Sequence, residues 1–211
     1  MRILESLSDD RKVRTKVCEI LSMMENEDEY TPEMEEWFKK RTQRHINLVR
    51  KYCMKIVNYD PERFEELLDR GSIHDQSKLE EPERTPYIYV SWDYKCKDDG
   101  VKWTPPKDIK DQMNQATQHH VLNNPHHPEF HQEKKVDLIN REDRDKPPKE
   151  MVDATKMTDL DIGEMCADWL AMSEEKGTSV KEWADKNVNI RWKFTPQQKS
   201  LIYEILEKVG K

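Results

Sequence analysis

The feature that most constrains the fold is the helical spacing of apolar residues within an otherwise highly charged chain. Apolar side chains recur every three to four residues in 13–24, 48–56 and 162–172, as on the buried face of an amphipathic helix. Charged residues make up 37% of the 211 residues, hydrophobic residues only 35%, and glycine occurs five times. This composition favours helices over a turn-rich β fold. The sequence therefore predicts an all-α fold with a heavily charged surface.

Helix start and stop signals predict the elements of one domain that covers residues 1–211. A first helix is expected over 9–25. A long second helix begins at Thr31-Pro32-Glu33, where a capping hydroxyl, a proline and an acid follow one another, and runs to about Val57. We expect the core at about 40–175, with the N-terminal and C-terminal helices packed on it. Later helices are expected from Asp60 to about Asp69, from Thr104 past His120, from Thr158 or Asp159 to about Glu174, from Val180 to Lys186 and from Thr195 to Gly210, with an exposed linker at 143–149.

The segment near 85–104 is expected to be a short irregular or β-like insertion in this helical bundle. Residues 87–92 are aromatic and β-branched, which fits a short strand. A helical turn packed over a site fits the same residues, and both interpretations stay open. Residues 95–104 are predicted to form a loop.

Charge and cysteine usage argue against several classes of function. The net charge of -7 disfavours broad binding to a nucleic-acid backbone, although a local basic groove is still compatible with it. No run of about 18 apolar residues is present, so no membrane span is expected. Residues 1–6 lack the apolar centre of a signal peptide. The four cysteines lie far apart without a C-x-x-C motif and are predicted to be reduced core thiols of a cytoplasmic protein: Cys18, Cys53, Cys96 and Cys166.

Residues with metal-binding chemistry occur together in the stretch 72–79, Ser-Ile-His-Asp-Gln-Ser-Lys-Leu. His74 and Asp75 offer a nitrogen and a carboxylate oxygen side by side, and both can bind one metal ion where the backbone bends sharply. Gly71, just before, would permit such a bend. Lys78 adds a positive charge three residues after Asp75. Taken alone, the stretch also fits a polar loop between helices.

Two further candidates lie on predicted helices. His45 falls on the apolar face of the second helix, three and four residues before Leu48 and Val49. A hydrogen-bonded core histidine is the alternative there. Asp168 lies within the almost wholly apolar stretch 165–172, so a buried carboxylate that needs a cation, a metal or several donors is expected. A solvated helix edge is the alternative for Asp168.

Five of the seven histidines lie between residues 119 and 131. His120 shares a helix face with Ile109, Met113 and Ala116, whereas His119 points about 100° away, so His120 is the one expected to face inward. The loop at 123–129 then carries two more histidines between prolines. A surface cluster is the alternative for this pair, His126 and His127.

The order and helical setting of these candidates resemble the HD-domain superfamily of metal-dependent phosphohydrolases. Residues 44–49 (Arg-His-Ile-Asn-Leu-Val) resemble the helix that carries its first histidine. Residues 73–78 (Ile-His-Asp-Gln-Ser-Lys) resemble its H-D-x-x-K turn, and residues 167–170 (Ala-Asp-Trp-Leu) its final A-D-x-L segment. More closely, the chain resembles an uncharacterised HD-like family of phages and bacteria, whose members carry similar HDxSK, HH…NxHHPE and late ADW segments. The resemblance spans about 40–175.

Two departures bear on what the resemblance implies. The Gly-Tyr-Pro segment of members that act on cyclic dinucleotides is absent, and residues 87–103 match no HD element. The resemblance therefore bears on the fold, an HD-domain-like helical bundle, and on metal binding more than on the substrate.

The resemblance implies a site for one or two divalent metal ions. His45, His74, Asp75 and Asp168 would hold the first ion. His120 and one of His126 and His127 would add the second, with Asp75 placed to contact both. Nitrogen and oxygen ligands of this kind suit Mn, Fe, Co, Ni or Zn, and also Mg.

The function that the resemblance implies is hydrolysis of a small phosphorylated substrate, a nucleotide or another phosphoester. Asp75 and Lys78 would be catalytic, because Lys78 can neutralise charge that develops on phosphate. Lys78, Arg44 and Arg41 would contact the substrate. Expected surroundings are the cytoplasm of a bacterial cell or of a phage-infected host, with no membrane as partner and nucleic acid disfavoured as one. The oligomeric state is left open.

Two other functions stay open at this point. The first is a di-iron oxygenase, because some HD-like proteins with four histidine and two aspartate ligands carry out oxidative chemistry. The second is an interaction protein, metal-stabilised or metal-free, such as a phage protein that acts on a host target. The acidic surface and the aromatic stretch 87–103 would suit that second function.

Overall fold

The computed structural model describes residues 30–133 and 150–210. The chain divides into two compact units, 1–32 and 33–211, and the elements below belong to the second unit apart from the first residue of its first helix. The helix predicted at 9–25, the thiol of Cys18 and the linker predicted at 143–149 lie outside the described residues. The packing of an N-terminal helix on the core therefore stays a prediction.

The described residues form a mostly helical structure, which confirms the predicted all-α fold. Its α-helices are α2 (Pro32–Tyr59), α3 (Pro61–Phe64), α4 (Leu67–Ile73), α5 (Arg84–Asp98), α6 (Lys107–Asn123), α7 (Asp159–Lys176), α8 (Val180–Asn187) and α9 (Pro196–Val209). Two short 3-10 helices are η1 (Gln76–Leu79) and η2 (Pro128–His131), and two parallel strands pair as β1 (Val152–Asp153) and β2 (Trp192–Lys193). Among these helices, none is long and apolar enough to cross a membrane.

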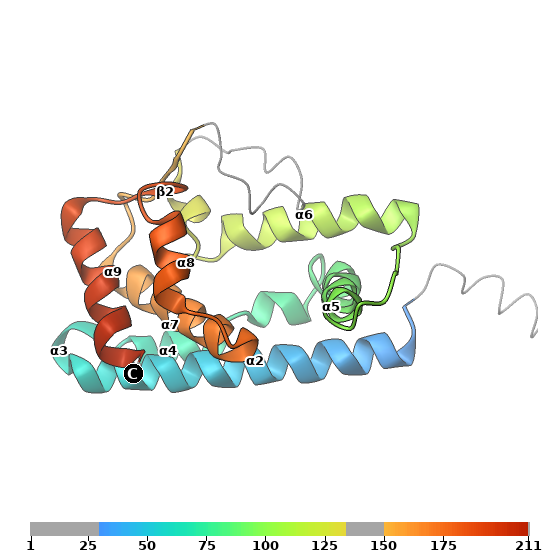
Figure 1. The fold of residues 1–211 in the computed structure, drawn as a ribbon, viewed down its shortest axis with the longest axis horizontal. Helices are drawn as coiled ribbons and strands as arrows, with labels where there is room; N and C mark the ends of the chain where they lie inside the picture. The colour runs from blue at the N-terminus through green and yellow to red at the C-terminus, as the bar shows by residue number, and fades with distance from the viewer. Residues whose placement is uncertain (1–29, 134–149, 211) are drawn as a thin grey trace, which may run out of the picture. The chain divides into compact units, whose positions relative to one another are not determined.

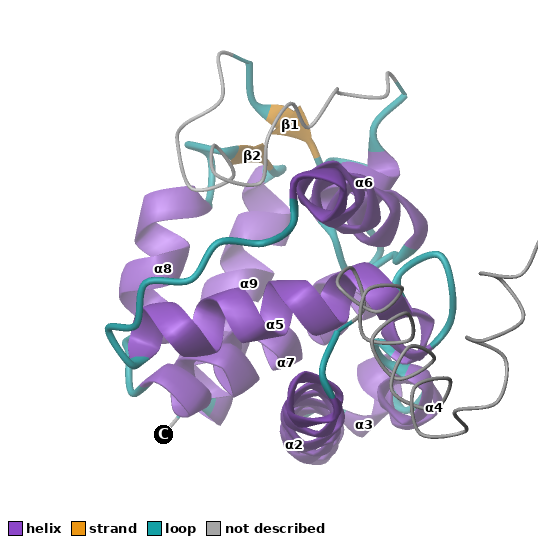
Figure 2. Cartoon of the chain, turned by 90° about the vertical axis from the view of Figure 1, so that its right-hand side faces the viewer, coloured by secondary structure: helices purple, strands orange, loops and turns teal. Residues whose placement is uncertain are grey.

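Helices α2 and α6 run along similar directions, and α5 crosses between them. Figure 1 shows α5 end-on between the two, and Figure 2, turned by 90°, shows α2 and α6 end-on with α5 lengthwise. Helix α5 packs against α6, and α7 packs against α3, α4 and α9. The long helix α2 runs past both the pair α5 and α6 and the group formed by α3, α4, α7 and α9 (Figure 1).

The hydrophobic core lies where α2, α3, α4, α7, α8 and α9 meet. Ile56 of α2, Phe64 of α3, Leu67 of α4, Ile162 of α7 and Ile202 of α9 are all completely buried in one continuous cluster. Full burial of one such side chain stabilises a fold by about 1.5–3 kcal/mol relative to leaving it exposed. This core holds α2 and α7 against each other, and both helices carry candidate site residues.

Local sequence signals account for several helix boundaries. Helix α7 starts with a capping box in which Thr158 and Asp161 bond to each other's backbone N–H groups, and it ends at Gly177 with a φ of 63°. Helix α9 starts with a similar box, formed by Thr195 and Gln198. Helix α6 starts at Lys107 rather than at Thr104, since a residue that precedes proline is disfavoured in helical geometry and two prolines follow Thr104.

The β-like alternative for the segment near 85–104 is wrong, because residues 84–98 form helix α5. Tyr89, Asp93 and Cys96 are buried at intervals of four and three residues, which is helical spacing. Contact with α6 favours the helix over the strand propensity of the aromatic and β-branched residues. The loop predicted at 95–104 accordingly begins only after Asp98.

The short helix predicted at 60–69 is also corrected. It divides into α3 and α4, and α4 continues to Ile73, so Gly71 lies inside a helix and not at a bend. A Cβ atom at Gly71 would lie 3.1 Å from Sγ of Cys53 on α2. Glycine therefore allows the close approach of α4 to α2 and does not form the bend.

The cysteines in the described ranges are buried and free, as expected for core thiols: Cys53, Cys96 and Cys166. Burial raises the pKa of the Cys53 thiol to about 12 and also raises the pKa of Cys166 well above its usual value. Both thiols are therefore protonated and poorly reactive at neutral pH.

Gly163 allows α7 to approach α3 and α4 closely. A Cβ atom at this position would lie 2.8 Å from Leu67 and 3.2 Å from Phe64, closer than side chains normally approach. We predict that Gly163→Val lowers the free energy of unfolding by about 1–3 kcal/mol, because the extra atoms overpack the core. Urea denaturation measures the change. Ser173→Val on the same helix is the control, and an equal loss in both variants would contradict the packing argument.

Candidate metal centre

The His-Asp pair lies at a sharp turn that Asp75 itself makes. Helix α4 ends at Ile73, and His74 then adopts extended backbone geometry. Asp75 has a φ of 59°, in the left-handed region that residues other than glycine seldom adopt, and Lys78 N donates to Asp75 O across the turn at 3.0 Å. The predicted bend is present, but Asp75 and not Gly71 provides it. Unusual backbone geometry of this kind concentrates at functional sites.

The carboxylate of Asp75 lies at the centre of four histidine rings that come from distant parts of the chain. Its Oδ2 lies 3.5 Å from Nε2 of His45 and 3.7 Å from Nε2 of His74. Its Oδ1 lies 3.1 Å from Nε2 of His120 and 3.9 Å from Nε2 of His126. Each oxygen therefore faces a different pair of imidazole nitrogens.

The remaining candidates complete two of three groups of potential ligands, and the third shares His74 and His126 with them and adds Glu164. His45, His74 and Asp168 form one group, which we call subsite 1, and their ligand atoms lie within 4.8 Å of one another. Oδ1 of Asp168 is 3.0 Å from Nε2 of His45. The second group, subsite 2, has the same spacing and consists of His120, His126 and His127. These buried clusters can hold a metal ion, with Asp75 between them.

Several inward-facing atoms are buried without a hydrogen bond from any other described residue. They include Nε2 of His74, Nε2 of His120 and Oδ1 of Asp75. A buried polar atom that lacks a partner costs about 1–3 kcal/mol, so native structures rarely keep one without a ligand, ion or water beside it. These orphaned lone pairs point to the same small volume, which fits a cation bound there.

The outer nitrogens of these histidines face carboxylates that the sequence analysis missed. Nδ1 of His74 donates to Oε1 of Glu164 at 2.8 Å, and Nδ1 of His120 donates to Oε2 of Glu83 at 2.9 Å. Nδ1 of His45 lies 3.4 Å from Oε2 of Glu175. A carboxylate can only accept, so in His74 and His120 it holds the proton on Nδ1 and leaves the lone pair on Nε2.

Two of these three omissions, Glu164 and Glu175, were detectable in the sequence. Glu164, Asp168 and Glu175 occur at intervals of four and seven residues, so they share one face of α7. An acidic face on an otherwise apolar helix indicates a buried polar site. Glu83 had no comparable signal, because it lies just before α5 in a stretch rich in glutamate.

The acids dominate the electrostatics of the pocket. Burial alone would lower the pKa of His45, but contacts with Asp168 and Glu175 raise it to about 9. Burial lowers the pKa of His74. Burial would raise the pKa of Asp75, yet Lys78, His74 and His120 hold it well below its usual range. In Asp168 the contact with His45 likewise outweighs burial and lowers the pKa. The pocket therefore keeps ionised carboxylates that attract cations.

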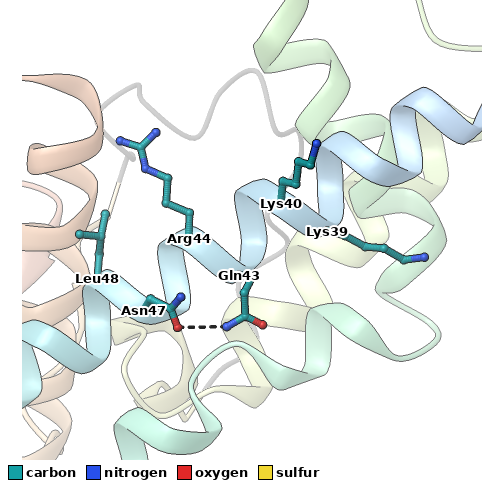
Figure 3. A pocket seen from close by; sticks show the side chains of 6 residues that line it. All are labelled: Lys39, Lys40, Gln43, Arg44, Asn47 and Leu48. Atoms are coloured by element: carbon teal, nitrogen blue, oxygen red, sulfur yellow. Dashed lines mark hydrogen bonds between the residues drawn. The ribbon is translucent and has the colours of Figure 1, made fainter.

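Of the predicted substrate-contact residues, Lys78 contacts Asp75 directly, whereas Arg41 and Arg44 lie near Glu175. Nζ of Lys78 donates to Oδ2 of Asp75 at 2.5 Å and lies over the ring of Tyr87, with a fifth of the side chain exposed. Arg41 and Arg44 lie close enough to Glu175 to help lower its pKa, after burial and the larger effect of His45. Arg44 is exposed and lines a surface groove along α2 (Figure 3).

The orientations predicted for the histidines of α6 are confirmed. His120 is buried, whereas the side chain of His119 is 42% exposed and contacts Oε1 of Glu83 at 2.7 Å. Both His126 and His127 lie at the cluster, and Nε2 of His126 is 3.9 Å from Oδ1 of Asp75. Asp168 is largely buried, with 17% of its side chain exposed.

The model of a family of unknown function, DUF5662, matches residues 34–208. The chain belongs to this family. The matched region includes every candidate ligand, from His45 to Asp168. No curated protein and no solved structure shows significant similarity to the chain.

The raised pKa of His45 predicts a specific pH dependence for the metal-free protein. A histidine with a pKa raised from 6.5 to about 9 stabilises the fold fully below pH 6.5 and loses that contribution as the pH rises through 9. The loss is on the order of 3 kcal/mol. Thermal unfolding between pH 6 and 9.5 with a chelator present measures it. His45→Gln should lack this decline, and the same slope in both proteins would contradict the assignment.

Proposed function

We propose that the chain is a metal-dependent phosphohydrolase that acts on a nucleotide or another phosphoester through a site for two divalent ions. The observation that carries the proposal is the position of Asp75, whose two oxygens each face a different pair of histidine nitrogens. A carboxylate between two sets of nitrogen ligands is suited to bridge two ions. The HD-like order of the ligands supports the same reading.

The donor set indicates which ions the site would take. In subsite 1, His45, His74 and Asp168 would act with Oδ2 of Asp75. Subsite 2 would use Oδ1 of Asp75 with histidines alone: His120, His126 and His127. Imidazole-rich sites prefer Mn, Fe, Co, Ni or Zn over Mg, which favours oxygen ligands.

The chemistry expected at this site is in-line hydrolysis. Bound divalent ions lower the pKa of water and polarise phosphoryl oxygens, which are the two effects that phosphoester hydrolysis needs. The turn at Asp75 would hold its carboxylate in a fixed position beside the ions. Lys78 would release Asp75 and donate to a phosphoryl oxygen, because its ammonium is partly exposed and already within the pocket. The reduced core thiols favour a cytoplasmic setting.

The first prediction of this proposal concerns metal stoichiometry. We predict two Mn²⁺ ions per wild-type chain and one ion per chain for His120→Ala, since subsite 2 loses a ligand that faces Asp75 at 3.1 Å. Equilibrium dialysis followed by elemental analysis gives the count. His119→Ala is a matched control from the neighbouring exposed position and should keep two ions. Equal counts in wild type and His120→Ala would argue for a mononuclear site.

The second prediction concerns activity. We predict that Asp75→Asn lowers metal-dependent hydrolysis by more than about 100-fold, because it removes the charge between the subsites. Asparagine tolerates the left-handed backbone of Asp75, so the fold should survive. Turnover of a panel of nucleotides and model phosphodiesters with Mn, Co, Ni and Mg is the measurement.

Matched controls separate this function from the alternatives. Asp93→Asn removes a buried carboxylate that pairs with Lys97 on α5, and it should leave turnover unchanged. Hydrolysis needs no oxygen, so activity should be equal in anaerobic buffer. Turnover that requires oxygen and iron would instead support an oxygenase. Full metal loading without turnover of any phosphoester would support an interaction protein.

A further inference from the structure

Glu164 on α7 contacts one histidine from each subsite. Its Oε1 lies 2.8 Å from Nδ1 of His74 and 3.3 Å from Nδ1 of His126. His74 follows α4 and belongs to subsite 1, whereas His126 follows α6 and belongs to subsite 2. The rings of these two histidines also lie together, with centroids 4.3 Å apart. One carboxylate oxygen thus orients ligands of both subsites.

The other outer carboxylates differ in this respect. Glu175 lies beside His45 of subsite 1, and Glu83 bonds to His120 of subsite 2 and to the outward-facing His119. Of these three outer glutamates, Glu164 is the one that contacts a histidine of each subsite. Glu175 and Glu83, which each contact a histidine of one subsite, therefore serve as matched controls for Glu164.

Arg70 holds Glu164 in place. Nε of Arg70 donates to Oε2 of Glu164 at 2.7 Å, and its Nη1 donates to Oδ1 of Asp161 at 2.6 Å. Asp161 is itself fixed in the capping box of α7. An arginine with two donors in fixed directions restrains a carboxylate better than a single-point cation does. Both oxygens of Glu164 are therefore occupied, and the carboxylate cannot turn away from the histidines.

We propose that Glu164, held by Arg70, is a positioning residue that couples the two metal subsites. The coupling is a shared dependence: one oxygen of Glu164 orients His74 in subsite 1 and His126 in subsite 2, so the metal affinity of both subsites depends on this side chain. The proposal rests on the two-ion site of the proposed function. It does not depend on which reaction the site catalyses.

Glutamine is the informative replacement for Glu164. It keeps the volume of glutamate but offers one donor and one acceptor group where the carboxylate offers two acceptors. Arg70, His74 and His126 all approach with N–H groups, so the amide nitrogen must face a donor on one side. The histidines then lose their fixed orientation, and loss of such an outer partner lowers metal affinity about 10–100-fold.

The experiment measures Mn²⁺ affinity by titration calorimetry of the full-length, chelator-treated chain in two backgrounds. His120→Ala leaves subsite 1, and His45→Ala leaves subsite 2. We expect Glu164→Gln to lower the affinity about 10–100-fold in both backgrounds. Glu175→Gln should lower it only where subsite 1 remains, and Glu83→Gln only where subsite 2 remains.

The outcomes separate the proposal from its alternatives. A loss confined to one background, or no loss in a folded Glu164→Gln protein, would overturn the coupling role, as would wild type that binds a single ion. Circular dichroism without metal checks the fold. If Glu164→Gln does not fold, Arg70→Lys carries the test, because lysine can hold only one of the two carboxylates. Arg70→Lys should lower the Mn²⁺ affinity of both subsites, and unchanged affinities would overturn the proposal.

Hydrolysis assays on the same proteins keep the two proposals apart. Wild type that binds two Mn²⁺ ions but hydrolyses no phosphoester would overturn the proposed function and leave the coupling intact. Hydrolysis by wild type, together with a Glu164→Gln effect in one background only, would overturn the coupling and leave the proposed function intact.

Discussion

The burial of the Asp75 carboxylate among four imidazole rings is the interaction on which the rest of this site depends. An ionised carboxylate out of contact with water is very costly unless cations or hydrogen-bond donors surround it. Here the ammonium of Lys78 contacts one oxygen, and the histidine nitrogens that face both oxygens are ligand atoms for a cation. The helices that carry those groups must therefore direct their polar residues to one point, while their apolar residues form the core beside it.

Helix α7 meets both requirements with two different faces. Its apolar residues pack against α3, α4 and α9, and the absence of a side chain at Gly163 brings it close to the first two of these helices. The acidic face with Glu164, Asp168 and Glu175 then reaches the histidines. Correct packing and correct ligand placement are thus the same geometric condition for this helix.

The sequence was most informative where a local rule decides the structure. Capping residues located the starts of α7 and α9, and the wheel position of His120 relative to His119 separated the inward from the outward ring. Each candidate ligand could be predicted separately from its position on a helix or turn, and the structure brings these residues together. The segment 84–98 was expected to be irregular or β-like because its aromatic and β-branched residues have strand propensity, whereas its tertiary contacts, with α6 among them, favour a helix.

The outer partners of the ligands were largely unreadable for a physical reason. Glu83 and Arg70 act across tertiary contacts, and neither residue differs locally from the many surface charges of this chain. The bend at Asp75 was expected from a glycine, yet the residue that adopts the left-handed backbone is the candidate ligand itself. Sequence periodicity describes one element at a time, whereas these features depend on two.

The candidate ligands come from α2, from the turn after α4, from α6 and its following loop, and from α7. An ion that joined His45 to Asp168 would act as a reversible cross-link between points more than 120 residues apart in the chain. Because the ligands are brought together only in the folded state, the ion binds that state alone and adds to its stability. The resistance of this protein to proteolysis in a cell would then follow the local supply of the metal.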